Sequence, residues 1–270
     1  MMNQNARRIW LTGASSGIGL ALAEKLLEAG ERVALTARTL GPLEALDERY
    51  PNQVLLAPGD ITDGEQVKAI GDRIAQVWGA LDTVILNAGT CEYIDVRNFD
   101  AKLVERVVRT NLLATCYCIM EALPLLRLGK RPHLVGVASA IAFLALTRAE
   151  AYGASKAGVR YMFESLRIDL AQENIDVTVV SPGFVDTPLT AANDFPMPMR
   201  WPVAKAARYI AERLQRSRRP MEISFPAAFV ITMKLVALLP TRIQLALTRR
   251  MVRPSTPQTA SALGAHKDIR

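Results

Sequence analysis

The chain has 270 residues and a formal net charge of +7, with 33 Lys and Arg against 26 Asp and Glu. Half of the residues are hydrophobic and 22% are charged, which excludes wholesale disorder, a collagen-like sequence and a disulfide scaffold. The length fits a single α/β domain with a sizeable buried core.

The positive charge is concentrated in the C-terminal quarter. Residues 1–199 hold 19 basic and 23 acidic residues, whereas residues 200–270 hold 14 and 3, a net charge of +11. Such a segment suits nucleic acid, an anionic membrane surface or an acidic protein partner. Because residues 200–253 contain no recognised nucleic-acid-reading motif and no regular aromatic platform, we expect no nucleic-acid partner.

The cysteines and the apolar runs indicate the compartment. Cys91, Cys116 and Cys118 form no C-x-x-C pair, and the two His residues lie far apart in the sequence. We therefore expect no metal site, no disulfide framework and a cytoplasmic protein with reduced thiols. The longest run of apolar and small residues, 134–146, has 13 residues, so no membrane-spanning helix is expected.

Short β-branched or Leu-rich runs alternate along the chain with longer amphipathic ones. The expected strands are 8–12, 32–37, 53–57, 81–86, 132–138, 175–181 and 221–225. The expected helices lie near 17–29, 41–49, 63–77, 100–127, 151–173 and 202–216. This alternation predicts a Rossmann-like, doubly wound parallel sheet of about seven strands in a three-layer α/β/α fold.

The domain boundaries follow from changes in composition. We expect a single Rossmann-type α/β domain over residues 1–225 and an apolar and basic helical extension over 226–253. Residues 254–270 are rich in Ser, Thr, Ala and Pro and lack apolar periodicity, so we expect a disordered tail.

The first strand leads directly into a glycine-rich turn, TGASSGIG at residues 12–19, followed by an amphipathic helix. Glycines allow a sharp turn and bring backbone N–H groups against a pyrophosphate, which the positive end of the helix dipole also favours. The spacing G-x-x-x-G-x-G differs from the common G-x-G-x-x-G, so the turn alone is weak support for a dinucleotide site.

The second strand ends at Arg38, where an NAD site usually places an acidic residue for the ribose 2′-hydroxyl. A guanidinium at this point can hold a 2′-phosphate bidentately, which favours NADP(H) over NAD(H). The alternative is a surface arginine that follows a strand.

A candidate catalytic group lies later in the chain. Tyr152 and Lys156 are four residues apart in an expected helix, so their side chains share one face. A neighbouring ammonium favours the phenolate, and we expect Lys156 to lower the pKa of Tyr152. Ser139 follows an expected strand at the sheet edge where open α/β folds bind ligands, and its hydroxyl could bind a carbonyl oxygen.

Together these motifs resemble the short-chain dehydrogenase/reductase family over about residues 8–225. The matching residues are Thr12 to Gly19, Asp60, Asn87-Ala88-Gly89, Asn111, Ser139, Tyr152 with Lys156, and Pro182-Gly183. The resemblance implies that Tyr152 is the general acid/base, that Lys156 lowers its pKa and binds the nicotinamide ribose, and that Ser139 orients the substrate oxygen. It also implies that Asn111 distorts its helix to hold a water of a proton relay.

The resemblance further implies a set of cofactor-binding residues. These are Gly13, Ser15, Ser16, Gly17, Ile18, Gly19, Arg38, Asp60, Ile61, Asn87, Ala88, Gly89, Tyr152, Lys156, Pro182, Gly183, Val185 and Thr187. Many NADP-using relatives carry a basic residue in place of Ser16, so Arg38 carries the preference almost alone. Relatives usually pair through the helices near 100–127 and 151–173, which implies a homodimer or homotetramer.

Two segments bear on the substrate and on partners. The loop 184–201 is rich in Met, Pro and aromatic residues, and with Ile141, Phe143 and Leu146 it favours an apolar carbonyl or alcohol, the alternative being core packing. In the extension, the apolar stretch 225–240 is interrupted by Lys234 and followed by arginines at positions 242, 249, 250 and 253. It suits a bilayer surface or an acidic carrier protein, the alternative being a helix docked on the body or on another subunit.

We therefore expect an NADP(H)-dependent oxidoreductase that interconverts a carbonyl and a secondary alcohol, acting mainly as a reductase. A 3-oxoacyl-(acyl carrier) reductase is an alternative, since acyl carriers are acidic. A non-catalytic NADP(H)-binding protein or membrane-surface scaffold is another. The sign of such a protein would be erosion of the four catalytic positions, and all four are intact.

Overall fold

The computed structural model describes residues 6–191 and 193–249. Seven parallel strands form one sheet in the order β3-β2-β1-β4-β5-β6-β9, which confirms the predicted doubly wound topology. The strands are β1 (Arg8–Thr12), β2 (Arg32–Thr36), β3 (Val54–Leu56), β4 (Thr83–Leu86), β5 (His133–Val137), β6 (Asp176–Pro182) and β9 (Glu222–Phe225). Because β1 lies between β2 and β4, the strand order reverses at β1 and β4, where such folds bind their ligands.

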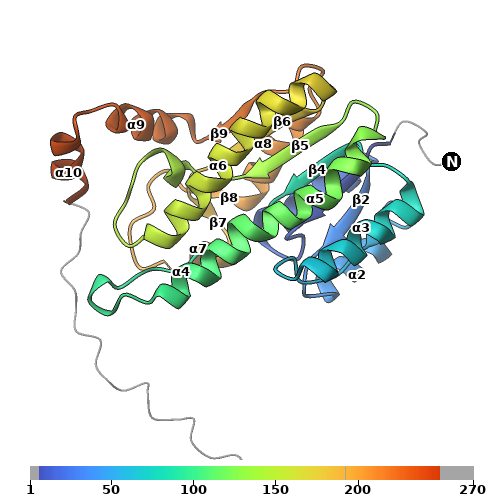
Figure 1. Ribbon diagram of the computed structural model, residues 1–270, viewed down its shortest axis with the longest axis horizontal. Helices are drawn as coiled ribbons and strands as arrows, with labels where there is room; N and C mark the ends of the chain where they lie inside the picture. The colour runs from blue at the N-terminus through green and yellow to red at the C-terminus, as the bar shows by residue number, and fades with distance from the viewer. Residues whose placement is uncertain (1–5, 192, 250–270) are drawn as a thin grey trace, which may run out of the picture.

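Helices cover both faces of the sheet (Figure 1). One layer contains α3 (Gly64–Trp78), α4 (Ala101–Val108), α5 (Ala114–Arg127) and α6 (Glu150–Leu170), and the other contains α1 (Gly17–Glu28), α2 (Gly41–Arg49) and α8 (Val203–Leu214). Successive side chains of β1 point to opposite faces of the sheet: Ile9 and Leu11 pack on the α1 side, and Trp10 packs on the α3 side. Burial on both faces explains why these strands read as nearly continuous apolar runs.

Several short elements were not predicted. They are η1 (Val96–Asn98), η2 (Arg109–Leu113), η3 (Ala140–Phe143), η4 (Ala171–Glu173), β7 (Val185–Asp186), α7 (Pro188–Ala191) and β8 (Trp201–Pro202). The strands β7 and β8 pair in parallel and join the two ends of the 184–201 loop. Elements of two to five residues are too short to show a hydrophobic period, so the sequence pattern could not predict them.

The C-terminal extension forms two helices, α9 (Ala227–Ala237) and α10 (Thr241–Arg249), which are separated at Pro240. Figure 1 shows α9 following β9 and α10 at the outer end of α9, on the side of the molecule away from α2 and α3. The expected tail 254–270, together with Arg250 and Arg253, lies outside the described residues.

Two searches were negative for the described ranges. Over 6–191 and 193–249, no helix is long and apolar enough to cross a membrane. In the same ranges, no group of three or more His, Cys, Asp and Glu side chains could hold a metal ion.

Candidate active site

A cleft of about 600 Å³ lies over the carboxyl ends of the central strands. All of the residues expected to bind a cofactor line it, and so does Ser139. Segments that are far apart in the sequence therefore meet at the point where the strand order reverses, as the topology requires.

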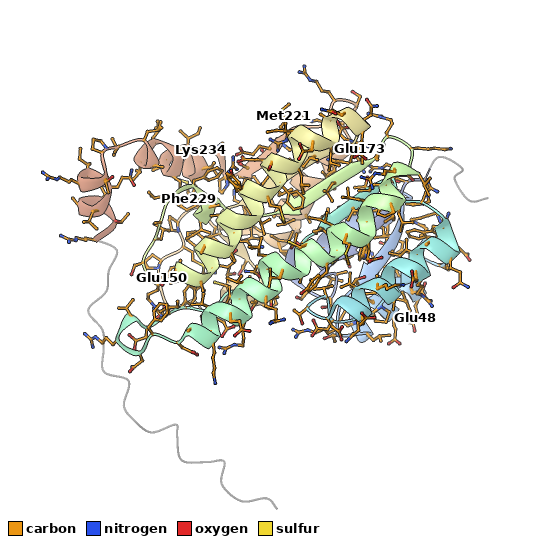
Figure 2. All side chains as sticks on the ribbon, in the orientation of Figure 1. Glu48, Glu150, Glu173, Met221, Phe229 and Lys234 are labelled. Carbon is orange, nitrogen blue, oxygen red and sulfur yellow. The ribbon has the colours of Figure 1, made fainter. Side chains whose placement is uncertain are left out.

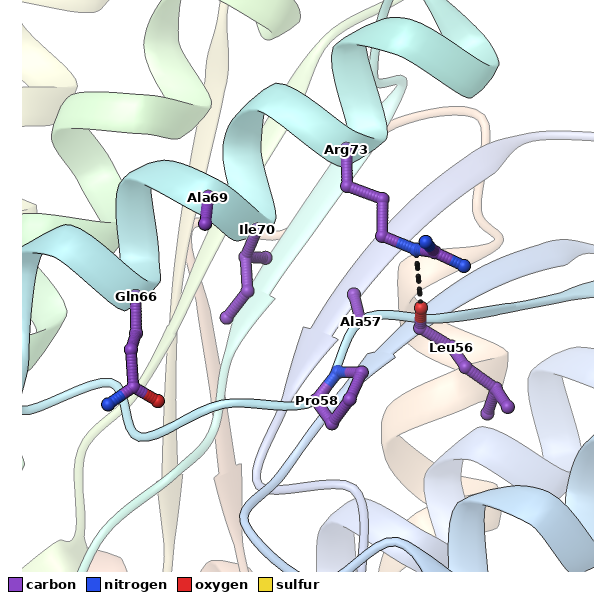
Figure 3. A pocket seen from close by; sticks show the side chains of 7 residues that line it. All are labelled: Leu56, Ala57, Pro58, Gln66, Ala69, Ile70 and Arg73. Atoms are coloured by element: carbon purple, nitrogen blue, oxygen red, sulfur yellow. Dashed lines mark hydrogen bonds between the residues drawn. The ribbon is translucent and has the colours of Figure 1, made fainter.

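A second cavity of about 410 Å³ lies between the end of β3 and α3 (Figure 3). Its lining is mostly apolar, and its charged member, Arg73, donates a hydrogen bond from Nε to the Leu56 carbonyl over 2.8 Å. None of the predicted catalytic residues lines this cavity, so the chemistry belongs to the larger cleft.

The glycine-rich turn leaves room for a ligand against the backbone. Gly13 has a φ of +69°, and a Cβ there would lie 2.7 Å from the Cα of Ala88. A Cβ at Gly19 would overlap the Gly13 carbonyl oxygen. The start of α1 has no side-chain cap from Ser16 and no acidic residue in its first turn, so its N–H groups are free to bind an anion. These features fit a dinucleotide pyrophosphate.

The turn after β4 is joined to the glycine-rich turn. Asn87 Nδ2 donates to the carbonyl oxygens of Thr12 and Gly13 over 3.1 and 3.3 Å. The Thr12 hydroxyl oxygen accepts hydrogen bonds from the backbone N–H groups of Asn87 and Ala88 over 3.1 and 3.2 Å. These four hydrogen bonds fix the two walls of the cleft relative to each other.

Arg38 lies at the end of the cleft that follows β2, and its side chain is exposed. Within residues 6–191 and 193–249, no hydrogen bond or ion pair engages its guanidinium. Asp60, on the neighbouring loop, accepts hydrogen bonds at Oδ1 from the backbone N–H and the hydroxyl of Thr62, each over 2.9 Å. The arginine is thus a free cation at the cleft, whereas the carboxylate is held by its own loop.

Tyr152 and Lys156 lie in the first two turns of α6, and both line the cleft. Lys156 Nζ donates to the carbonyl oxygen of Val137 at the end of β5 over 2.9 Å, and it lies 6.0 Å from the centre of the Tyr152 ring. Burial lowers the pKa of Lys156 to about 8, because the charged form loses its hydration. The ammonium is therefore close to its titration range near neutral pH.

The pKa of Tyr152 is shifted in the direction opposite to the one predicted from the sequence. Burial raises it above its ordinary value, the nearby Cys91 raises it further, and the Ser139 hydroxyl lowers it. The expectation that Lys156 would bring it down is therefore corrected, because the cost of burying a phenolate exceeds the favourable interactions. The phenol keeps its proton at neutral pH.

Asn111 lies behind the cleft, in the middle of one widened turn of helix. The helix expected over 100–127 is continuous but contains the π-helical segment η2 between α4 and α5. In this segment Asn111 is completely buried, and its Nδ2 donates to the Thr90 carbonyl over 2.9 Å and to Ser155 Oγ over 2.8 Å. Its Oδ1 accepts from the Thr90 N–H over 2.7 Å. Single π turns are frequent at functional sites.

This network includes two residues that the sequence analysis missed. Ser155 donates to the carbonyl oxygen of Tyr152 over 2.8 Å, so Asn111 is connected to the start of α6 through one hydroxyl. Thr90 joins the same amide to the loop after β4. Their positions next to Lys156 and Gly89 were the available signal, but the pairing with Asn111 depends on the fold.

Ser139 caps the short helix η3 directly after β5. Its Oγ accepts from the backbone N–H of Ile141 over 3.3 Å and donates to the Pro182 carbonyl over 3.5 Å. Both contacts are long, so the hydroxyl remains able to bind an oxygen in the cleft.

Aromatic side chains gather beside the 184–201 loop. The ring centres of Tyr93 and Phe195 are 5.5 Å apart, those of Phe184 and Phe195 are 6.0 Å apart, and those of Phe184 and Phe229 are 5.4 Å apart. Tyr93 also donates from its hydroxyl to Asn193 Oδ1 over 2.6 Å. Tyr93 and Phe229 were not predicted, because they come from a loop and a helix remote in sequence.

Three other residues predicted near the substrate are placed differently. Ile141, Phe143 and Leu146 are not part of the lining of the cleft. Phe143 instead lies under two cations, with the Arg160 guanidinium 4.4 Å and Lys234 Nζ 4.5 Å from its ring centre.

The chain is similar in sequence and in fold to known proteins. Residues 7–195 match the family model for short chain dehydrogenases. An uncharacterized oxidoreductase of Myxococcus xanthus is 34% identical over 255 residues, which covers 93% of this chain and 100% of that protein. An uncharacterized oxidoreductase of Mycobacterium tuberculosis is 35% identical over 191 residues, or 68% of this chain and 76% of the relative.

Solved structures share the fold. A short-chain dehydrogenase from Streptomyces avermitilis superposes with a TM-score of 0.78 at 23% identity, covering 93% of this chain and 98% of that chain. A short chain dehydrogenase from Burkholderia cenocepacia, in complex with NADP, has a TM-score of 0.77 at 26% identity, covering 92% and 98%.

Proposed function

The chain belongs to the short-chain dehydrogenase/reductase family and is an oxidoreductase, and from this premise we propose that it reduces an apolar ketone or aldehyde with NADPH. The observation that carries the proposal is the meeting of Ser139, Tyr152 and Lys156 in one cleft, with the phenol protonated. A protonated phenol is the form that reduction of a carbonyl requires, because the new alcohol needs a proton.

A nicotinamide dinucleotide bound in the cleft supplies or accepts the hydride. The residues that would hold it are the glycine-rich turn at its pyrophosphate, Lys156 at the nicotinamide ribose and Arg38 at the adenosine ribose. The unengaged guanidinium of Arg38 supports NADP(H), as does the presence of NADP in the relative from Burkholderia cenocepacia.

Each catalytic side chain has a different role at the substrate oxygen. Tyr152 donates its phenolic proton to this oxygen, and the Ser139 hydroxyl donates a hydrogen bond to it. Lys156 keeps a positive charge near the phenol as the negative charge develops on Tyr152. Asn111 positions the start of α6 through Ser155, so the catalytic tyrosine keeps its orientation.

The surroundings of the cleft favour an apolar substrate. Tyr93, Phe184 and Phe195 do not line the cleft themselves. Tyr93 and Phe184 directly follow the lining residues Glu92 and Gly183 in the sequence, Phe195 contacts both of their rings, and such rings bind apolar groups. An ion pair between Arg148 and Asp194, at 3.0 Å, fastens the substrate loop on its outer side.

We also propose that the protein forms a homodimer or homotetramer through α6 and the continuous helical segment of α4, η2 and α5. Leu113 and Met120 are exposed at a spacing of seven residues, and so are Tyr161 and Ile168. This spacing places each pair on one helix face, where a second copy would cover it. The cytoplasm is the compartment that we propose, since the three cysteines are free thiols.

The function is tested with purified protein, NADPH and a panel of hydrophobic ketones that includes a 3-oxoacyl thioester. We expect oxidation of NADPH that falls by about 1000-fold or more in Tyr152→Phe, since general acid catalysis contributes about 10²- to 10⁴-fold. Tyr50→Phe, at the end of α2 and outside the lining of the cleft, is the matched control and should keep full activity. Activity retained by Tyr152→Phe would refute the mechanism.

A further inference from the structure

The helix α9 has two apolar faces. Val230 and Met233 are buried on one face, which packs on the body of the protein. Ile231, Leu235 and Leu238, on the other side, have 55%, 59% and 82% of their surface exposed. Residues at these spacings form one stripe along the helix. The extension is therefore docked on the body and still presents a continuous apolar stripe outward.

The helix α10 continues this apolar surface. None of its residues is buried, and Ile243, Leu245 and Leu247 are exposed. Gln244 Nε2 donates to the carbonyl oxygens of Ala237 and Leu239 over 3.0 and 2.7 Å, which fastens α10 to the end of α9. Ile243 and Leu247 share one side of α10, whereas Leu245 lies on the other side. We use the name α9–α10 face for the exposed residues Ile231, Leu235, Leu238, Leu239, Ile243 and Leu247.

The charge on the α9–α10 face is of one sign. Residues 223–249 contain no Asp or Glu. Lys234 is neutralised by Glu222, 2.8 Å away, but Arg242 and Arg249 are exposed and have no ion pair within the described part of the chain. A second copy of this face would bring like charges together, whereas an anionic lipid surface offers both apolar depth and negative headgroups.

The α9–α10 face is held firmly beside the site. Phe229 and Lys234 both lie on α9 (Figure 2). Phe229, in the first turn, contacts Phe184 at the base of the substrate loop, and Lys234 Nζ donates to Glu222 on β9 over 2.8 Å. Arg160 of α6 binds the same carboxylate over 3.2 Å. Whatever binds the α9–α10 face therefore lies next to the loop that borders the catalytic cleft.

From these contacts we propose that the α9–α10 face binds the protein to an anionic membrane surface, with the substrate loop beside the lipid. Binding lies in the plane of the interface, because α9 and α10, with 11 and 9 residues, are too short to span the bilayer. An apolar substrate dissolved in the membrane would then have a short path to the cleft.

The test is flotation of the full-length protein with vesicles of phosphatidylcholine alone and of phosphatidylcholine mixed with phosphatidylglycerol. We expect binding to the mixed vesicles that weakens as salt is raised. The double variant Leu235→Ser, Leu238→Ser should bind about tenfold or more weakly, because two apolar side chains no longer enter the interface. Arg242→Gln and Arg249→Gln should each weaken binding to the mixed vesicles about fivefold.

The matched control is the double variant Leu128→Ser, Met221→Ser, whose side chains are both 68% exposed on other elements. It should bind the mixed vesicles like the parent protein, and thermal melting should show that all variants are folded. The proposal is overturned if the parent protein does not float with mixed vesicles at low salt, or if the leucine variant floats equally well. It is also overturned if light scattering shows that the leucine variant loses an oligomer that the parent forms, since the face would then be a subunit interface.

Discussion

Replacement of Arg38 by Asp should invert the cofactor preference. In the structure the Arg38 guanidinium is exposed at the cleft and has no partner in the described residues, so a 2′-phosphate would be its first strong ligand. The aspartate removes this ligand, repels the phosphate and offers an acceptor to the free 2′-hydroxyl of NADH. Binding of NADPH should weaken while binding of NADH is kept or improved.

The expected size of the effect follows from the exposure of Arg38. A hydrogen bond to a charged group contributes about 1.5 to 3 kcal/mol, and solvent screening at an exposed position favours the lower end. A loss of about 1.5 kcal/mol corresponds to roughly tenfold weaker binding of NADPH. Repulsion by the new carboxylate adds to this loss, so the ratio of the two dissociation constants should change by more than about tenfold.

The assay is a pair of fluorescence titrations, with NADPH and with NADH, on the parent and on Arg38→Asp. Arg97→Asp, which makes the same charge change at an exposed position outside the cleft, is the control for long-range electrostatics and should leave the ratio unchanged. If the ratio of the dissociation constants for NADPH and NADH is the same in Arg38→Asp as in the parent, the assigned role of Arg38 is wrong.

Two further predictions concern pH. Burial brings the pKa of Lys156 to about 8, so the ammonium is lost as pH rises through this value. We therefore expect kcat/KM for carbonyl reduction to fall over the same range. A profile that stays flat from about pH 7 to 9.5 would contradict the proposed role of the charge. His133 is completely buried, and its Nε2–H donates to Thr178 Oγ1 over 2.8 Å, because the Thr178 hydroxyl donates its own proton to the Pro220 carbonyl. Its pKa is far below the ordinary value because of desolvation and the nearby Arg219 and Arg7. The unfolded chain therefore binds a proton that the folded chain excludes, so stability is full above a pH of about 6.5 and decreases below it, by about 1.3 kcal/mol between pH 7 and 5.5. Urea denaturation at both pH values should show this loss in the parent and a smaller one in His133→Gln, and equal losses in both proteins would disprove the assignment.

The parts of the site that could be predicted depend on local patterns. The turn at residues 12–19, Arg38 after β2 and Ser139 after β5 each follow a strand, and the carboxyl ends of parallel strands meet at one edge of the sheet. The strands themselves were recognisable because burial on both faces leaves them apolar throughout. The spacing of Tyr152 and Lys156 predicted that they share one helix face, but their catalytic role was predicted only from their combination with the other motifs.

Other features depend on contacts between remote segments. Asn111 is connected to Tyr152 only through Ser155, and Tyr93 meets Phe195 across about a hundred residues of chain. No periodicity in the sequence relates these positions. The same holds for β7 and β8, which pair across the substrate loop although each has two residues.

The sequence by itself determined the strand and helix order, the parallel sheet and the residue types available for catalysis, because these follow from short-range periodicity and from turn chemistry. Only the tertiary structure decided the direction in which the pKa of Tyr152 is shifted, since desolvation depends on every atom that surrounds a group and not on its neighbours in the chain. It likewise decided which face of α9 is covered by the body and which stripe, with Leu235 and Leu238, remains exposed. A helix that is apolar on two sides does not show in its sequence which side will pack.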